Sequence, residues 1–361
     1  RQWMDKSAYT YGLHGTPTTF TLEERIATLE GGLQCLLAPS GLAALALVNL
    51  GLLKTGDEVL LPDNAYGPGK DLAAGELRQF GITHQVYDPM KPADLADRVT
   101  PRTRLVWLEA AGSVTLEFPD LLAQARLCRE LGVLSALDNT WGAGLAFNPF
   151  NLDGRGLAVD ISVQALTKYP SGGGDVLMGS VVTRDAALHR KLKLCHMRLG
   201  LGVGGNDAEA VLRALPTLPL RYAAADRSAR RLAEWAARQA PFAQVLHPAL
   251  PASPGHAHWQ AVCGAADAAG QGAAASLFSV VIDEKFSREQ VDAFCDALRL
   301  FRIGYSWGGP FSLVMPYELQ TMRHDWPAHL ARGTLVRFAI GLEDTADLQG
   351  DLQHAMQQTL A

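Results

Sequence analysis

An apolar stretch runs directly into a glycine-rich turn in the segment Asp160-Ile-Ser-Val-Gln-Ala-Leu-Thr-Lys168-Tyr-Pro-Ser-Gly-Gly-Gly-Asp175. The residues up to Ala165 have the apolarity and length of a buried strand, and the glycines predict a turn after it. Lys168 therefore stands where a strand ends. A buried amine at that place loses part of its preference for the charged form, so it could act as a nucleophile and a base near neutral pH. The alternative is a solvated surface lysine.

Short apolar runs alternate with helical stretches on both sides of this segment, from Gly32 to about Thr183. We expect seven strands, at residues 35–38, 58–61, 83–87, 105–109, 134–138, 159–165 and 179–182. Apolar residues at helical spacing predict crossover helices at 42–53, 70–80 and 121–131, each followed by a glycine just past its end. This alternation predicts an α/β fold with a mostly parallel seven-stranded sheet that helices cover.

The composition changes near Leu215-Pro-Thr-Leu-Pro219, which predicts a domain boundary. An Ala- and Arg-rich helix from about Tyr222 to Gln239 should follow, then a strand at 277–282, a helix at 288–298 and a strand at 335–340. The Ala- and Gly-rich residues 264–275 predict a mobile loop. We therefore expect an N-terminal segment at 1–18, a larger domain at 19–215 and a smaller α+β domain at 216–361.

The composition is that of a globular protein, because 361 residues with 48% hydrophobic and 19% charged content can bury one large core and a smaller one. A net charge of -5 and the lack of any lysine or arginine run disfavour nucleic acid and anionic membranes as partners. The five cysteines are scattered and form no C-x-x-C, which predicts a reducing cytoplasm rather than disulfides or zinc. No stretch is long and apolar enough to predict a membrane span.

The N-terminal sequence Arg1-Gln-Trp-Met-Asp5 lacks the features of a signal peptide, and the missing initiator methionine suggests an N-terminal truncation.

Ligands of a parallel sheet bind beyond the carboxyl ends of its strands, so the residues after the predicted strands are candidates for chemistry. In Pro39-Ser-Gly41-Leu42, a glycine that opens a helix could present backbone N–H groups to a phosphate, or form only a structural turn. Tyr66, in a glycine-containing loop, could stack on a flat ring or simply pack. Asp138 ends a buried strand, so its carboxylate needs a partner. It could pair with a protonated pyridine nitrogen or cap a helix.

The order of glycine turn, aromatic loop, acid and lysine suits a pyridoxal phosphate site. Asp138 would keep the pyridine nitrogen protonated, so that the ring draws electrons from the substrate Cα, while Thr167 and the Gly41 turn would hold the phosphate. We therefore predict pyridoxal 5'-phosphate as the cofactor.

Two other kinds of site are disfavoured. The region of His247, His256 and His258 contains prolines and glycines typical of an irregular loop and offers no carboxylate or thiol partner, so we expect no metal. The run Gly200-Leu-Gly-Val-Gly-Gly205 follows a basic, helix-like segment rather than a buried strand, which disfavours a nicotinamide site.

Seven motifs carry a resemblance to a known family. They are Tyr11-Gly-Leu-His-Gly-Thr-Pro-Thr18, Leu29-Glu-Gly-Gly32, Pro39-Ser-Gly41, Asp138-Asn-Thr-Trp141, Thr167-Lys-Tyr169, His247-Pro-Ala-Leu-Pro251 and Tyr305-Ser-Trp-Gly-Gly309. With them the chain resembles, over nearly its whole length, the Cys/Met-metabolism family of pyridoxal phosphate enzymes. This resemblance implies the fold-type I architecture of transferase-like pyridoxal phosphate enzymes. Within the family, the last motif together with Asp138-Asn-Thr-Trp141 looks most like the bacterial cystathionine β-lyases.

The resemblance also implies a role for each candidate residue. Lys168 would bind the cofactor covalently, Asp138 would pair with its ring nitrogen, and Tyr66 would stack on the ring. The phosphate contacts would come from Gly41, Leu42 and Thr167, and the substrate contacts from Arg337, Ser306, Trp307 and Tyr66. Arg337 would bind the substrate α-carboxylate, for which a structural ion pair is the alternative.

Tyr11 would act, with Lys168 and Tyr66, as a catalytic residue and would contact the cofactor of a neighbouring subunit. The resemblance thus implies a homo-oligomer, a tetramer built as a dimer of dimers with shared active sites.

The implied reaction is the β-elimination of L-cystathionine to homocysteine, pyruvate and ammonia, a step of methionine biosynthesis. Lys168 would remove the Cα proton and protonate the departing thiolate. The chain departs from the family at Leu13-His14 in place of an arginine, at Ala165 in place of a serine, at Gly172-Gly-Gly174, and at Pro310-Phe311 in place of a glutamate. These departures keep two alternatives open, which are a broader cysteine or methionine lyase and a cofactor-binding relative without turnover.

Overall fold

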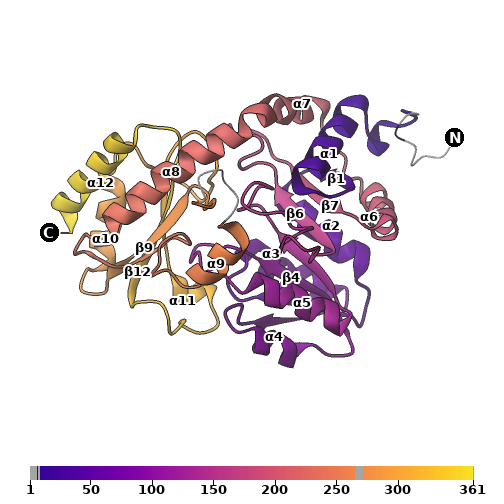
Figure 1. The fold of residues 1–361 in the computed structure, drawn as a ribbon, viewed down its shortest axis with the longest axis horizontal. Coiled ribbons are helices and arrows are strands. Elements are labelled where there is room, and N and C mark those ends of the chain that lie inside the picture. Colours follow the sequence, from indigo (N-terminus) through magenta and orange to yellow (C-terminus); the bar gives the residue numbers. More distant parts are fainter. Residues whose placement is uncertain (1–5, 7–8, 265–270, 361) are drawn as a thin grey trace.

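The computed structural model describes residue 6 and residues 9–264 and 271–360, and it folds into two sheets with their helices (Figure 1). The first sheet has the strand order β1-β7-β6-β5-β4-β2-β3. Its strands are β1 (Gln34–Ala38), β2 (Glu58–Pro62), β3 (Thr83–Tyr87), β4 (Thr103–Glu109), β5 (Leu134–Asp138), β6 (Ile161–Ala165) and β7 (Gly179–Thr183). Only β7 runs antiparallel to its neighbours, β1 and β6. The predicted seven-stranded, mostly parallel sheet is confirmed, with every strand within two residues of its expected bounds.

Helices cover both faces of this sheet because successive side chains of a strand point to opposite sides. Leu36 and Val163 pack on one face against α2 (Gly41–Leu52) and α6 (Ala186–Leu199). Leu37 and Leu137 pack on the other face against α1 (Pro17–Glu30) and α5 (Leu121–Leu131). The other helical elements of this part are η1 (Gly12–His14), α3 (Gly67–Leu72), η2 (Ala73–Leu77), α4 (Pro92–Arg98), α7 (Gly205–Ala214) and η3 (Leu215–Thr217).

The second sheet has the order β10-β11-β12-β9-β8 and is antiparallel except between β10 and β11. Its strands are β8 (Phe242–Leu246), β9 (Leu277–Asp283), β10 (Arg302–Ile303), β11 (Leu313–Tyr317) and β12 (Gly333–Ala339). Val336 and Phe338 point into a core shared with α8 (Leu218–Ala236), α10 (Arg288–Ala297) and α12 (Thr345–Thr359). The short helix α11 (Leu319–Met322) completes this part, whereas α9 (His256–Cys263) packs with α5 in the core of the first sheet.

The opposite face of the second sheet looks toward the first sheet. Val281 and Leu335 pack there against Val114, which lies in the loop after β4. Arg337 lies on this face too, because it alternates along β12 with the core residues Val336 and Phe338. The long helix α8 connects the two parts across the top of Figure 1. The joint between the two sheets is therefore where side chains from both can meet.

Three expected elements differ from the structure. The helix expected at 70–80 is the α-helix α3 followed by the π-helical turn η2, which contains Gly75. The helix expected from about Tyr222 begins at Leu218 instead, because Pro219 is compatible with a first helical turn. The loop expected around His256 becomes α9 from that residue onward. Residues 265–270 of the expected loop at 264–275 lie outside the described residues.

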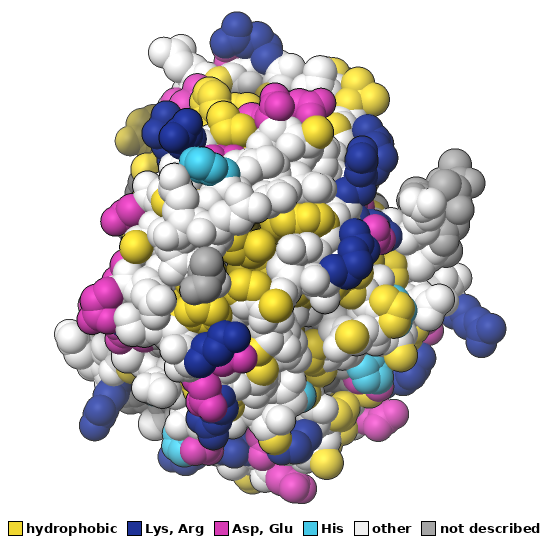
Figure 2. Space-filling view, turned by 90° about the vertical axis from the view of Figure 1, so that its left-hand side faces the viewer, with side chains coloured by type: hydrophobic (Ala, Val, Ile, Leu, Met, Phe, Trp, Pro, Cys, Tyr) yellow, Lys and Arg dark blue, Asp and Glu magenta, His cyan; other side chains and the backbone are white. Residues whose placement is uncertain are grey.

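The face at the left of Figure 1 is shown in Figure 2, where basic and acidic side chains are interspersed around a central strip of hydrophobic ones. Of the helices that the structure describes, none has both the length and the apolarity to cross a membrane.

Candidate active site

A cavity of about 770 Å³ lies between the carboxyl ends of the first sheet and the inner face of the second. Nine of the ten expected site residues line it, namely Gly41, Leu42, Tyr66, Asp138, Thr167, Lys168, Ser306, Trp307 and Arg337. Tyr11 is the exception. Its ring is 61% exposed and contacts His14 edge-on, and it is not among the described residues that line the cavity of its own chain.

The Lys168 amine points into the cavity just beyond the end of β6. Its Nζ donates a hydrogen bond to Ser306 Oγ at 2.9 Å and lies 5.3 Å from the centre of the Trp307 ring. Burial and, after it, the charge of Arg337 lower the pKa of Lys168 from 10.5 to about 8, against the opposing charge of Asp138. A larger fraction of this amine than of an ordinary lysine is therefore neutral near physiological pH, as a nucleophile or base requires.

Gly308 lets the 305–309 turn come this close to Lys168. Its φ of +77° is in the region that favours glycine, and a Cβ there would lie 3.0 Å from the Tyr169 backbone nitrogen. A side chain at Gly308 would push Ser306 and Trp307 away from the lysine.

Asp138 ends β5 and directs its carboxylate at the same cavity. Oδ1 accepts two hydrogen bonds from Thr140, one from the backbone N–H at 3.0 Å and one from the hydroxyl at 2.5 Å. Burial raises the pKa of Asp138, while the Thr140 hydrogen bonds and the Lys168 charge oppose the rise. In the described part of the chain both hydrogen bonds fall on Oδ1, which leaves Oδ2 for a cation. A protonated pyridine nitrogen is a suitable partner for Oδ2.

Glu109 is a cavity residue that the sequence reasoning missed. It ends β4, pairs in register with Asp138 on β5, and accepts a hydrogen bond at 2.9 Å from the Tyr66 backbone N–H. Burial, followed by the charge of Asp138, raises the pKa of Glu109 well above its usual range. Glu109 therefore fixes the loop that carries Tyr66. Glu109 could have been predicted from its position at the end of a predicted strand, since Asp138 was selected for the same reason.

The first turn of α2 borders the cavity beside β6. Ser40 caps the helix by accepting from the Ala43 N–H, and the first N–H groups of a helix have no intrahelical partner. A Cβ on Gly41 would lie 2.6 Å from the Ala165 Cβ, so glycine is needed for α2 to approach β6. Thr167 uses its hydroxyl to accept from the Met178 N–H at 3.1 Å. The free amides of α2 fit an anionic group such as a phosphate.

Arg337 is the buried cation of the cavity, with 5% exposure. It donates to the Tyr305 carbonyl oxygen at 2.6 Å and lies 5.2 Å from the centre of the Tyr317 ring. No carboxylate among the described residues lies within ion-pair distance of it, so the structural ion pair is not found there. The guanidinium can therefore take a carboxylate from a ligand.

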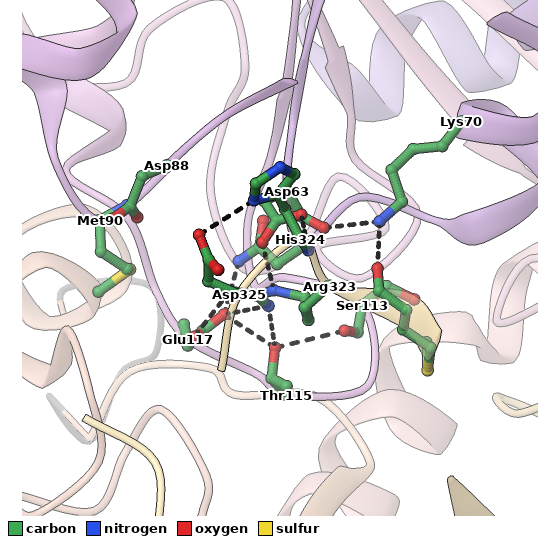
Figure 3. Close-up of polar contacts among 12 residues, drawn as sticks. Asp63, Lys70, Asp88, Met90, Ser113, Thr115, Glu117, Arg323, His324 and Asp325 are labelled. Atoms are coloured by element: carbon green, nitrogen blue, oxygen red, sulfur yellow. Dashed lines mark hydrogen bonds and ion pairs between the residues drawn. The ribbon is translucent and has the colours of Figure 1, made fainter. Parts of the chain in front are cut away.

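A second polar cluster ties the cavity wall from the C-terminal part to the first sheet, as Figure 3 shows. Arg323 donates to Asp63 at 2.9 Å and to Glu117 at 3.0 Å. Glu117 is fully buried and also accepts from Asn64, Thr115 and His329. Lys70 donates to the carbonyl oxygens of Asp63 and Met322 at 2.7 and 2.6 Å. This cluster fixes the segment from Met322 to His329 against the loop that carries Tyr66.

Replacing Glu117 with glutamine is expected to lower the free energy of unfolding by about 3 kcal/mol near neutral pH. Burial by itself would raise the pKa of Glu117, but the His329 hydrogen bond and the Arg323 charge outweigh it and lower the pKa from 4.5 to about 2. A depressed carboxyl pKa stabilises the fold above 4.5, and the stabilisation is lost as the pH falls toward 2. Urea unfolding measured at several pH values checks both statements.

The difference between the wild type and Glu117→Gln should therefore shrink as the pH is lowered below about 4. The exposed Glu284 supplies the control, because Glu284→Gln should leave the unfolding curve unchanged. If the Glu117→Gln protein were as stable as the wild type at neutral pH, the charge of Glu117 would make no net contribution to the free energy of unfolding.

The described residues contain no group of three or more His, Cys, Asp or Glu side chains placed to hold a metal ion. His247 is fully buried and His256 hydrogen-bonds to the Pro248 carbonyl oxygen, so both belong to the local packing.

Comparisons with known proteins agree with this geometry. A sequence model described as "Cys/Met metabolism PLP-dependent enzyme" matches residues 2–357. The chain is 38% identical to a cystathionine beta-lyase of Bordetella avium, over 99% of this chain and 86% of that one. It is 35% identical to a cystathionine beta-lyase of Escherichia coli K12, over 95% of this chain and 84% of that one. A crystal structure of a cystathionine gamma synthase from Xanthomonas oryzae pv. oryzae, in complex with cystathionine, superimposes with a TM-score of 0.86 at 29% identity, over 98% of this chain and 88% of that one.

The family match covers nearly the whole chain, and Lys168, Asp138 and the α2 turn provide the groups that pyridoxal phosphate needs. The chain belongs to the Cys/Met metabolism family of pyridoxal phosphate-dependent enzymes.

Proposed function

We propose that this protein is a pyridoxal phosphate-dependent carbon–sulfur β-lyase that cleaves L-cystathionine to homocysteine, pyruvate and ammonia, a step of methionine biosynthesis. Relatives named cystathionine beta-lyase, which are 35–38% identical over nearly the whole chain, support this reaction. The structural observation that carries the proposal is the buried Arg337, which shares a cavity with the Lys168 amine and has no carboxylate partner among the described residues. The α-carboxylate of an amino-acid substrate is a suitable partner for the Arg337 guanidinium.

Six residues are proposed to hold the cofactor. Asp138 Oδ2 would accept from the ring nitrogen, Tyr66 would stack on the ring, and Lys168 would bind covalently. Gly41 and Leu42 would donate backbone N–H groups to the phosphate, with the Thr167 hydroxyl beside them. The bound cofactor supplies an electron sink that makes the substrate Cα proton acidic.

The remaining chemistry falls to side chains of this chain. Arg337 binds the α-carboxylate and so orients the substrate, while Ser306 and Trp307 keep the amine of Lys168 in place. Lys168 removes the Cα proton, the Cβ–S bond breaks with its electron pair on sulfur, and the same amine returns the proton to the thiolate. Hydrolysis of the three-carbon remainder gives pyruvate and ammonia, so that one water is consumed for each cystathionine.

Tyr11 is proposed to complete the active site of a second subunit. This is supported by its exposed ring and by its absence from the described residues that line the cavity of its own chain. Leu177 and Tyr305, which are 70% and 69% exposed at the cavity, are suitable apolar surface for such a subunit to cover. We propose a tetramer built as a dimer of dimers, which analytical ultracentrifugation would test.

We also propose the division into an N-terminal segment at 1–18, a cofactor-binding domain at 19–215 and a C-terminal domain at 216–361. Two core clusters that are each confined to one sheet and its helices support this division. A cytoplasmic location is proposed because all five cysteines are free thiols.

The function is tested by adding L-cystathionine to the protein with bound pyridoxal phosphate and measuring pyruvate and free thiol together. We expect the two products in equal amounts, since one cleavage of Cβ–S releases one of each. Formation of 2-oxobutyrate and cysteine instead would contradict β-cleavage. A protein that binds the cofactor and forms no product from cystathionine, cysteine or other thioethers would support the relative without turnover. Equal turnover of cysteine and cystathionine would favour the broader lyase.

A further inference from the structure

The outer end of the cavity carries a pair of opposite charges that the proposed reaction does not use. Arg288 and Glu318 both line the cavity, and Arg288 Nη1 lies 3.0 Å from Glu318 Oε1. Their side chains are 42% and 63% exposed, so the pair is open to solvent and to a ligand. Among the described charged residues that line the cavity, Arg288 and Glu318 are the two that do not belong to the site described above.

The pair lies at a suitable distance from the proposed carboxylate site. Met315 on β11 pairs in register with Arg337 on β12, and Glu318 stands three residues beyond Met315. Three residues of extended chain span about 10 Å. Seven single bonds separate the two carboxyl carbons of cystathionine, a reach of about 9 Å when extended. A cystathionine held by Arg337 at one end therefore brings its second amino-acid group near Glu318.

The charges of the pair match those of that second group. An α-amino acid carries one ammonium and one carboxylate, which need an acceptor such as Glu318 and a donor such as Arg288. An exposed ion pair contributes little to the stability of a protein, so exchanging it for two contacts to a zwitterion costs little. The planar guanidinium of Arg288 can also bind a carboxylate with two parallel hydrogen bonds.

The backbone that carries Glu318 is held in place, so that only side chains need to move. Glu318 directly precedes α11, whose last residue Met322 accepts a hydrogen bond from Lys70. The next residue, Arg323, is anchored by Asp63 and Glu117 in the cluster of Figure 3. Arg288 stands on the first turn of α10 and is also paired with Asp292 at 2.9 Å. A rigid support of this kind suits recognition of one ligand length.

We propose that Arg288 and Glu318 form a second subsite that binds the distal amino-acid group of cystathionine, Glu318 accepting from its ammonium and Arg288 binding its carboxylate. This inference rests on the proposed function. It makes the pair a determinant of specificity, which separates cystathionine from thioethers without a second amino-acid group.

The test compares two substrates in steady-state assays of pyruvate formation. L-Cystathionine has the distal group, whereas S-propyl-L-cysteine has the same α-amino acid and thioether but ends in a methyl group. Glu318→Gln and Arg288→Met should each raise KM for cystathionine about five- to twentyfold with kcat nearly unchanged. Neither variant should change the constants for S-propyl-L-cysteine. Glu289→Gln is the matched control, since Glu289 is an exposed neighbour on α10 outside the cavity lining.

Equal loss with both substrates would overturn the subsite, because it would place the effect on folding or on the reacting end. Unchanged KM for cystathionine in both variants would overturn it as well. A wild-type protein that cleaves neither thioether would instead overturn the proposed function, together with the inference built on it.

Discussion

Lys168→Ala is expected to reduce pyruvate formation from L-cystathionine on the order of 10⁴-fold or more, because one amine is proposed to perform two proton transfers and the covalent attachment of the cofactor. No other described lysine lines the cavity, so none can take its place. The low pKa of about 8 makes this amine reactive, and an alanine supplies no group that could replace it.

Absorbance spectra provide a readout that does not depend on turnover. The wild type with pyridoxal phosphate should show the visible band of a lysine-bound cofactor, and Lys168→Ala should lose it. Lys285→Ala is the control, because Lys285 is exposed and lies outside the cavity lining. A variant that keeps the band would show that another lysine carries the cofactor and that the role assigned to Lys168 is wrong.

Arg337→Met is expected to lower kcat/KM for L-cystathionine by about 10²- to 10³-fold, which corresponds to about 3–4 kcal/mol of lost transition-state stabilisation. The guanidinium is buried, so a carboxylate bound to it is shielded from water and interacts strongly. Methionine keeps a similar length without the charge. Because removal of a buried cation relieves a desolvation cost, the variant should fold at least as well as the wild type.

Two further variants make the result specific. Arg337→Lys should recover only part of the activity, since an ammonium cannot make two parallel hydrogen bonds to a carboxylate. Arg302→Met, an exposed change outside the cavity lining, should leave the kinetics unaltered. If Arg337→Met retained its kcat/KM for cystathionine, the α-carboxylate would have to bind elsewhere.

The strands of the first sheet were predictable because most of them are short, largely apolar runs that end in a turn. The run ending at Asp138 and the run ending at Tyr87 were located with both bounds correct. Helix ends were less accurate where a proline or glycine allows more than one conformation, as at Pro219 and Gly75. The strand β8 and the proline-containing β11 have no such pattern, and their pairing with β9 and β12 determines that they are strands.

The residues expected at the site could be found from two signals, the position at a strand end and the family motifs. Those signals identified Lys168 and Asp138 but passed over Glu109, although it also ends a strand. They gave no indication of Arg288 and Glu318, which lie on a helix and a loop of the other part. Such residues become candidates only when the fold brings them to one cavity.

The sequence by itself determined the parallel sheet, the family and the chemical type of the site, because apolar periodicity and local motifs depend on neighbouring residues. Only the tertiary structure decided how reactive that site is. The pKa of Lys168 depends on burial and on the charge of Arg337, which belongs to the second sheet. Likewise, Glu117 is paired with Arg323 because the fold brings two segments distant in the sequence into contact. Electrostatic energy depends on distance in space and on exclusion of water, and neither can be read from positions along the chain.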